Sequence, residues 1–230
     1  MIIYQPTDGY CYNSDTIFLY DFIKNFNIKG DILDIGSGSG VLGLLIARDF
    51  RVNLTAVEKQ EKMVFFTRLN AKVNKIDIDI KVGDFQNIDF DKKFDFLISN
   101  PPFYHKDVLR SKNEEFNISR NASYLPFEDI LKKANLILKP KGSFIFCYDA
   151  KQIQMIITLL STYKFTVEAI KFLFPKKDKE ANLSMIYARK SSKSFCKIFP
   201  PLIVFDGQIY SKEATEVFKK TGVHSIKCKI

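Results

Sequence analysis

Residues 31–43 constrain the fold of this chain more than any other stretch, and they read Asp-Ile-Leu-Asp-Ile-Gly-Ser-Gly-Ser-Gly-Val-Leu-Gly. A short apolar run with a strand pattern (32–35) meets three alternating glycines, and an apolar helical pattern follows over 41–50. Glycine allows sharp backbone turns and close approach of a ligand, and the helix after it begins with free N–H groups. The motif therefore predicts a strand, a ligand-binding turn and a helix, which form one unit of an α/β sheet.

The same alternation of strand and helix patterns continues along the chain. Strand patterns lie at 31–36, 52–57, 78–83, 94–99, 142–149, 164–173 and 182–190. Helical patterns lie at 41–50, 60–74, 127–138, 151–162, 211–220 and 16–25, the last with Asn13 or Ser14 as its expected N-cap. The tail adds an apolar run at 201–205. Such alternation predicts a mostly parallel sheet with helices on both faces, in which ligands bind at the carboxyl ends of the strands.

Two acidic residues follow strands at the edge where the glycine turn is expected. A dinucleotide fingerprint requires glycine at its sixth position, but that position here is Val41. Glu58 lies 18 residues past Gly40 at a strand end, where a carboxylate can accept both hydroxyls of a ribose. Asp84 ends the next strand and can accept the amine of an adenine, with Phe85 beside the ring. Each acid alone is more typical of a solvated strand end, but their order together favours a binding site.

The tetrad Asn100-Pro101-Pro102-Phe103 ends the strand pattern at 94–99. Two successive prolines cannot continue a strand, because neither has an N–H and both have a fixed φ. The Asn100 side chain and the Pro101 carbonyl can accept the two hydrogens of an exocyclic amine, while the ring of Phe103 stacks on the base. The tetrad alone is also consistent with an ordinary strand-terminating turn.

Taken together, these motifs resemble the class I S-adenosylmethionine-dependent methyltransferases of the Asn-Pro-Pro-aromatic type. Within them the chain looks most like the bacterial valine-tRNA adenine-N6-methyltransferases. That resemblance also rests on Asn70 and on the segments 8–19, 125–128 and 206–213, and it runs from about residue 5 to about residue 218. The chain departs from the family at Cys11, where a basic residue is usual, and at Phe103, where many relatives have Tyr.

The resemblance implies a Rossmann-like class I methyltransferase fold, with a mostly parallel seven-stranded sheet and an antiparallel hairpin at its edge. It implies an enzyme that methylates N6 of an adenine in a tRNA anticodon loop, adenine 37 of valine tRNA, without a metal. The implied catalytic residues are Asn100, Pro101, Pro102 and Phe103. The residues implied to bind S-adenosylmethionine are Asp34, Gly36, Ser37, Gly38, Gly40, Glu58, Lys59, Asp84, Phe85 and Asn100.

Other families use the same tetrad or one close to it. Guanine-N2 methyltransferases of ribosomal RNA often carry Asn-Pro-Pro-Phe, and they remain the main alternative, although many have a duplicated domain. Release-factor glutamine methyltransferases carry Asn-Pro-Pro-Tyr, but they have an additional N-terminal helical domain. A non-catalytic RNA-binding module is the remaining alternative, and the intact glycine loop, Glu58, Asp84 and Asn100 argue against it.

Charge is distributed unevenly along the chain, whose total is +9. Residues 1–100 hold 12 basic and 14 acidic residues, a net of −2, whereas residues 101–230 hold 23 basic and 12 acidic residues, a net of +11. A basic second half is typical of a protein that binds a polyanion such as RNA, although a lysine-rich surface can also serve solubility alone. The candidate RNA contacts are Tyr104 and Arg120 in the polar stretch 104–123, and Lys176 and Lys177 with their basic neighbours Lys171 and Lys179.

The length of 230 residues fits a single domain, with a helical lead-in (1–30), a cofactor-binding core (31–150) and an edge hairpin with a C-terminal extension (151–230). The start of the chain lacks the pattern of a signal peptide, and no apolar run approaches a membrane span. Four scattered cysteines without a Cys-x-x-Cys pair indicate reduced thiols in a cytoplasmic protein. Nothing in the sequence requires a dimer, so a monomer is sufficient.

Overall fold

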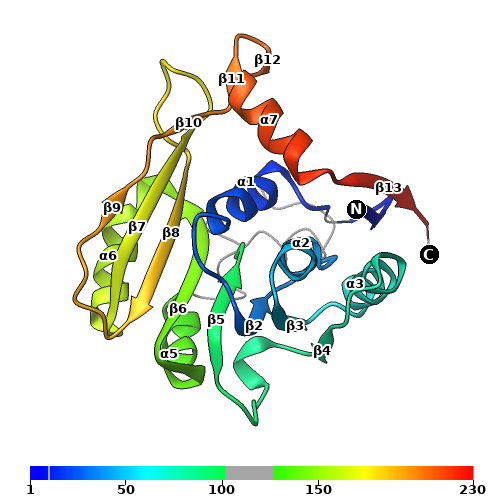
Figure 1. Cartoon of the computed structure of the whole chain (residues 1–230), viewed down its shortest axis with the longest axis horizontal. Helices are drawn as coiled ribbons and strands as arrows, with labels where there is room; N and C mark the ends of the chain where they lie inside the picture. The colour runs from blue at the N-terminus through cyan, green and yellow to red at the C-terminus, as the bar shows by residue number, and fades with distance from the viewer. Residues whose placement is uncertain (10, 102–126, 230) are drawn as a thin grey trace.

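The structure is a computed structural model that describes residues 1–9, 11–101 and 127–229, and Figure 1 shows its arrangement. Its central sheet has the strand order β10-β7-β8-β6-β5-β2-β3-β4. The parallel part comprises β2 (Gly30–Ile35), β3 (Val52–Glu58), β4 (Asp79–Val82), β5 (Phe94–Ser99) and β6 (Leu138–Asp149). The strand β8 (Leu183–Lys190) runs antiparallel between β6 and β7 (Phe165–Phe174). The predicted parallel sheet with an antiparallel edge hairpin is therefore confirmed.

Two further strands of two residues each extend the sheet beyond the predicted seven. Both β9 (Lys197–Ile198) and β10 (Leu202–Ile203) pair with β7 in parallel. The apolar run at 201–205 thus forms β10 and the start of β11. A strand of two residues has too short a pattern to be recognised from sequence, so only its pairing with β7 defines it.

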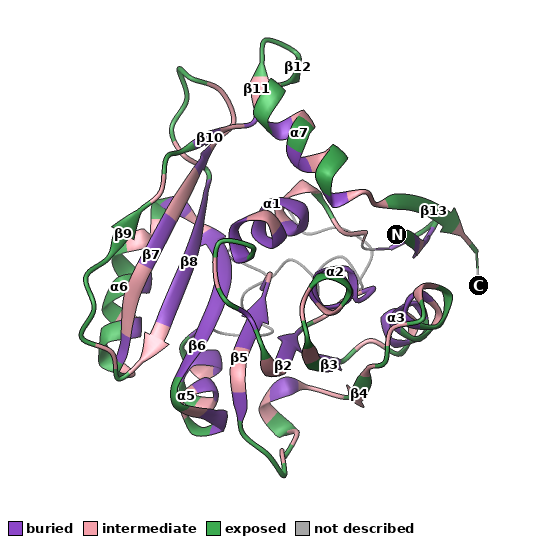
Figure 2. Ribbon diagram, viewed as in Figure 1, coloured by how far each residue is buried: buried purple, intermediate pink, exposed green. Residues whose placement is uncertain are grey.

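Helices cover both faces of the sheet, and each face has its own hydrophobic cluster. One face is covered by α1 (Ser14–Ile23), α2 (Val41–Asp49), α3 (Glu61–Asn74) and α7 (Lys212–Thr221). The other is covered by α5 (Phe127–Ile137) and by α6 (Ile153–Thr162), which the 3₁₀ turn η3 (Ala150–Gln152) precedes. Successive residues of one strand point to opposite faces, so Ile32 joins the first cluster and Leu33 the second. Figure 2 shows that β5, β6 and β8 are mostly buried between these layers.

The two ends of the chain form a small sheet that the sequence patterns did not predict. The strands β1 (Ile2–Pro6) and β13 (His224–Cys228) pair in parallel, from Ile2 opposite His224 to Pro6 opposite Cys228. A short hairpin, β11 (Phe205–Asp206) with β12 (Ile209–Tyr210), precedes α7. Within the described residues, no helix is both long and apolar enough to cross a membrane.

Asn70 on α3 ties β1 to the body of the protein. Its amide forms a reciprocal pair with Tyr4, accepting from the Tyr4 N–H at 2.7 Å and donating to the Tyr4 carbonyl at 3.0 Å. It also donates to the Ser39 carbonyl at 2.9 Å, and the Asn70 side chain is fully buried. One turn later, Asn74 makes the same reciprocal pair with Ile2 closer to solvent. Two asparagines therefore dock the terminal strand on α3.

We expect Asn70→Ala to lower the free energy of unfolding by about 2–4 kcal/mol, because it leaves a buried carbonyl of Ser39 and two partly buried backbone groups of Tyr4 without partners. Denaturant unfolding followed by circular dichroism measures this change. Asn74→Ala is the matched control, and it should lower the free energy by less than about 1 kcal/mol, because water replaces the lost contacts. Equal losses in the two variants would contradict the burial argument.

Candidate active site

The glycine turn after β2 adopts the backbone that its sequence predicts. Gly36, Gly38 and Gly40 have φ values of 67°, 57° and 79°, which non-glycine residues rarely adopt. A side chain on Gly40 would come within 2.8 Å of Thr67 on α3, whereas one on Gly36 would meet no atom of the described residues within 4 Å. The turn is therefore packed against α3 at its end and open to solvent at its start, where a ligand can lie over the backbone.

Glu58, the last residue of β3, is held by the backbone on both sides of the turn. Its Oε2 accepts from the Gly38 N–H and its Oε1 accepts from the Gln60 N–H, both at 2.8 Å. The residue is only 6% exposed, and this burial raises the pKa of its carboxyl, although the backbone N–H groups partly oppose the shift. Each carboxylate oxygen keeps a further lone pair, so the fixed side chain can accept two hydroxyls at once.

Asp84 lies beside Glu58, as predicted, because β4 ends next to β3. The Gly83 N–H donates to the Glu58 carbonyl at 2.9 Å, which joins the ends of the two strands. The Asp84 carboxylate accepts from the Gln86 N–H at 3.0 Å and forms an ion pair with Lys59 at 3.0 Å. Lys59 and Asp84 thus lie together at the carboxyl edge of the sheet.

Asn100 follows β5 at the same edge. The end of β5 is tied to the end of β2, because the Ser99 hydroxyl donates to the Ile35 carbonyl at 2.8 Å. The Asn100 amide donates from Nδ2 to Thr16 Oγ1 at 3.1 Å, and its Oδ1 accepts from the Cys147 thiol at 3.0 Å. Pro101 is buried beside it. The predicted residues Pro102, Phe103, Tyr104 and Arg120, with the stretch 104–123, lie outside the described residues.

These residues converge on one edge of a parallel sheet, where open α/β folds bind ligands. Residues 13–172, which contain all of them, match the model of the methyltransferase small domain. The chain belongs to the methyltransferase small-domain family. The resemblance of the chain to methyltransferases is thereby confirmed.

Individual relatives of this methyltransferase agree with the family match. The tRNA1(Val) (adenine(37)-N6)-methyltransferase of Phocaeicola vulgatus is 26% identical over 192 residues, which cover 83% of this chain and 81% of the relative. The protein of the same name from Flavobacterium johnsoniae is 26% identical over 228 residues, which cover 90% of each chain. The crystal structure of a predicted O-methyltransferase from Agrobacterium tumefaciens has a TM-score of 0.67 at 18% identity, and the match covers 93% of this chain and 100% of that chain. The last likeness supports the fold alone.

Asp34 lies beneath the glycine turn of this methyltransferase rather than on its surface. It is 2% exposed, and its Oδ2 accepts from the Gly43 N–H at 3.0 Å, which links β2 to the first turn of α2. Burial, opposed by the hydrogen bond from the Gly43 N–H and aided by the nearby Glu58, raises the pKa of Asp34 to about 7. Asp34 therefore supports the turn from below, and its predicted contribution to S-adenosylmethionine binding stays a prediction that this burial limits to support of the turn.

The raised pKa of Asp34 predicts a pH-dependent loss of stability. Between about pH 4 and pH 7 the folded protein keeps a proton on Asp34 that the unfolded chain releases, so this group destabilises the fold progressively as the pH rises. Asp34→Asn removes the titration. We therefore expect the difference in free energy of unfolding, variant minus wild type, to increase as the pH rises from about 4 to about 7. Denaturant unfolding at several pH values measures the difference. A difference that stays constant between pH 4 and pH 8 would contradict the prediction.

Phe85 occupies the predicted position next to Asp84, but its ring belongs to the core. The side chain is 3% exposed, its ring packs on Phe90 with 6.3 Å between centroids, and Lys133 Nζ lies 5.3 Å from the ring centroid. The Phe85 ring therefore has almost no surface with which to stack on an adenine. We therefore correct the expected place of the Phe85 ring beside an adenine, and the proposal below gives Phe85 no contact with the cofactor.

Several residues at the site were not assigned a role there by sequence reasoning. Ser39 is buried, and its hydroxyl, like that of the predicted residue Ser37, has no hydrogen-bond partner in the described part of the chain. Thr67 donates to the Gly38 carbonyl at 2.7 Å and so holds the turn from α3. Thr16 and Cys147 contact Asn100 from α1 and β6. No local pattern marks these residues, because their roles depend on elements that are distant in sequence.

Lys176 and Lys177 lie in the turn between β7 and β8. Since β7 runs parallel to β5 and β6, its carboxyl end lies at the same edge of the sheet as Asn100. Lys177 is exposed and Lys176 is half-buried. The four cysteines are free, as expected. The described residues contain no group of three or more histidine, cysteine, aspartate or glutamate side chains that could hold a metal ion.

Proposed function

We propose that this methyltransferase transfers a methyl group from S-adenosylmethionine to the exocyclic N6 amine of an adenine in the anticodon loop of a tRNA. The observation that carries the proposal is the position of the Asn100 amide, at the end of β5 beside the glycine turn of β2. The names of the relatives from Phocaeicola vulgatus and Flavobacterium johnsoniae favour adenine 37 of valine tRNA as the target. A tRNA substrate implies a cytoplasmic enzyme.

The described residues fit the proposed cofactor. Among the described residues, Gly36 leaves open space above the turn, and the buried Ser37 hydroxyl has no hydrogen-bond partner. Glu58 would hold the ribose hydroxyls with the free lone pairs of its two fixed oxygens, and Asp84 beside Lys59 would accept the adenine amine. The backbone of Gly38 and Gly40 would shape the rest of the turn. When bound, S-adenosylmethionine supplies an electrophilic methyl group.

Asn100 and Pro101 would activate the target amine. The lone pair of an aromatic amine is delocalised into the ring, so the nitrogen is a poor nucleophile. Accepting its two hydrogens at Asn100 Oδ1 and at the Pro101 carbonyl would favour a pyramidal nitrogen and stabilise the positive charge that develops there. Alignment of the two reactants supplies the rest of the acceleration, and no strongly basic side chain is required. Phe103 would stack on the adenine, which must leave its own stack to reach the site.

RNA binding is proposed to involve the basic turn at Lys176 and Lys177 together with Tyr104 and Arg120. We expect the double charge reversal Lys176→Glu/Lys177→Glu to weaken tRNA binding by about tenfold or more at low salt, because it replaces attraction to phosphates with repulsion. Filter binding or fluorescence anisotropy measures the affinity. The matched control is Lys92→Glu/Lys93→Glu, which reverses two adjacent lysines at the amino end of β5. Equal weakening by both double variants would contradict a specific role for the turn.

The decisive experiment is methyl transfer from labelled S-adenosylmethionine to unmodified tRNA and ribosomal RNA, followed by nucleoside mass spectrometry. N6-methyladenosine in valine tRNA is the expected product. N2-methylguanosine in ribosomal RNA would replace the proposal with the guanine-N2 alternative, and methylglutamine in a release factor would replace it with the protein-modifying one. RNA binding without methyl transfer or cofactor binding would indicate a non-catalytic module.

A further inference from the structure

We infer that Thr16 and Cys147 are positioning residues that hold the Asn100 amide with its oxygen presented to the substrate amine. This inference rests on the proposed function, because that function gives Asn100 its role in methyl transfer. Two hydrogen bonds hold the two sides of the Asn100 carboxamide. Its Nδ2 donates to Thr16 Oγ1 at 3.1 Å, and its Oδ1 accepts from Cys147 Sγ at 3.0 Å.

The orientation of the amide decides whether Asn100 can accept a hydrogen. A carboxamide has an acceptor oxygen on one side and an NH₂ group with two donors on the other, so a rotation of half a turn exchanges them. A target amine offers hydrogens, and an inverted Asn100 would oppose them with its own N–H groups. The proposed reaction therefore requires one of two orientations that are almost identical in shape.

The chemistry of the two partners selects the productive orientation. Cys147 is fully buried, and burial, with a contribution from Asp15, raises the pKa of its thiol well above the ordinary value, so the S–H stays protonated and donates. A thiol is a weak donor and a weak acceptor, so it uses one lone pair of Oδ1 without competing strongly for the other. The second lone pair remains for the substrate. Thr16, only 5% exposed, fixes the NH₂ side.

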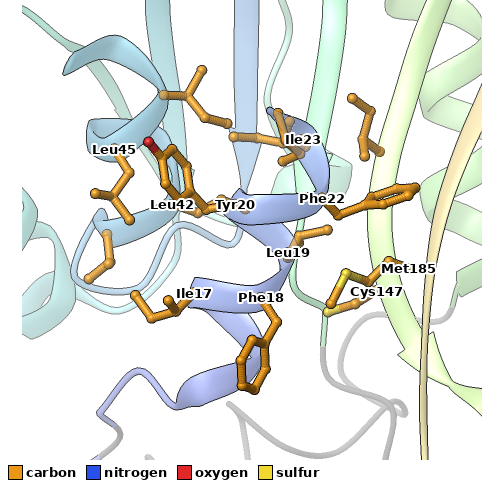
Figure 3. Close-up of a cluster of buried hydrophobic side chains, with 14 of the residues drawn as sticks. Ile17, Phe18, Leu19, Tyr20, Phe22, Ile23, Leu42, Leu45, Cys147 and Met185 are labelled. Atoms are coloured by element: carbon orange, nitrogen blue, oxygen red, sulfur yellow. The ribbon is translucent and has the colours of Figure 1, made fainter. Parts of the chain in front are cut away.

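Both partners lie on rigid elements outside the glycine and proline motifs. Cys147 is on β6 opposite Met185 of β8, and Figure 3 shows these two sulfur-containing side chains together to the right of α1. Thr16 is in the first turn of α1, beside Ile17 and Phe18 of the same hydrophobic cluster. Side chains on packed strands and helices fix the position of a functional group more precisely than side chains on loops do.

Kinetics of the full-length protein test the inference with unmodified tRNA and S-adenosylmethionine at saturation. We expect Thr16→Val and Cys147→Ala each to lower kcat about tenfold, which corresponds to about 1.4 kcal/mol. The KM for tRNA and the Kd for S-adenosylmethionine should stay unchanged, because neither contact binds them. Thr16→Ser and Cys147→Ser restore an acceptor and a donor, so both should recover kcat to within about twofold of the wild type.

Two control variants separate positioning from packing. Thr55→Val removes a buried hydroxyl that has no partner within the described residues, and Ile145→Val shortens a buried side chain on the same strand as Cys147. Both controls should leave kcat unchanged. The inference is overturned if Thr16→Val and Cys147→Ala keep wild-type kcat in an active enzyme, or if the controls lower kcat equally.

An infrared measurement tests the contact without any substrate. The S–H stretching band of Cys147, isolated as the difference between wild type and Cys147→Ala, should move to higher frequency in Asn100→Ala, because the hydrogen bond is lost. A band that does not move would overturn the inference. If the wild type methylates no RNA but the band moves, the proposed function has failed, whereas the hydrogen bond from Cys147 that orients the Asn100 amide is supported.

Discussion

Asn100→Ala is expected to lower the rate of methyl transfer by two to three orders of magnitude, about the effect of removing one group that stabilises a transition state. The variant removes the amide oxygen that would accept from the target amine, and it leaves the glycine turn and Glu58 in place. The rate under single-turnover conditions measures the loss. Calorimetric titration with S-adenosylmethionine should give a Kd close to that of the wild type.

The matched control for this truncation is Asn53→Ala. Asn53 lies near the amino end of β3, where its amide donates to Asp31 at 3.2 Å, so the same chemical change occurs at the opposite edge of the sheet. Its rate should equal that of the wild type. A collapse of cofactor affinity in Asn100→Ala, with no change in the rate per bound complex, would refute the catalytic role.

Glu58→Gln is expected to weaken S-adenosylmethionine binding by about 100-fold, because one oxygen cannot satisfy two donors. The N–H groups of Gly38 and Gln60 both point at the Glu58 carboxylate. Whichever way a glutamine turns, its NH₂ group faces one of these donors, so a charge-assisted hydrogen bond is lost and the turn must shift. A hydrogen bond to a charged group contributes about 1.5–3 kcal/mol, and every 1.4 kcal/mol corresponds to a tenfold change in Kd. The loss of one such bond, when it distorts the binding turn, therefore gives an effect of about 100-fold.

Glu168→Gln is the control for this variant. Glu168 has a side chain that is 13% exposed and pairs with Arg189 at 3.5 Å, so it is also a largely buried and partnered glutamate. It lies near the start of β7, at the other end of the strands. Its Kd for the cofactor should match that of the wild type, and wild-type affinity in Glu58→Gln would show that Glu58 does not bind the ribose.

The amino-acid sequence predicted the elements that form the site because their signals are local. Glycine adopts positive φ without the steric cost that other residues pay, and Gly36, Gly38 and Gly40 all have positive φ in the turn. Strand patterns that end at Glu58, near Asp84 and at Asn100 placed these residues on one edge, because parallel strands share their carboxyl ends. Boundaries shifted by a few residues: β6 begins at Leu138, earlier than predicted, because Leu138 pairs with Phe94 ahead of an irregular register.

Only the tertiary structure decided how these residues are supported. Three features depend on segments that lie far apart in sequence. They are the burial of the Phe85 ring, the pairing of β1 with β13, and the hydrogen bonds of Thr16 and Cys147 to Asn100. Such contacts depend on which face of one element packs on another, and no local periodicity records that. Sequence by itself thus determined the order of strands and helices and the chemistry at their ends, whereas packing determined the orientation, burial and protonation of the groups that carry it.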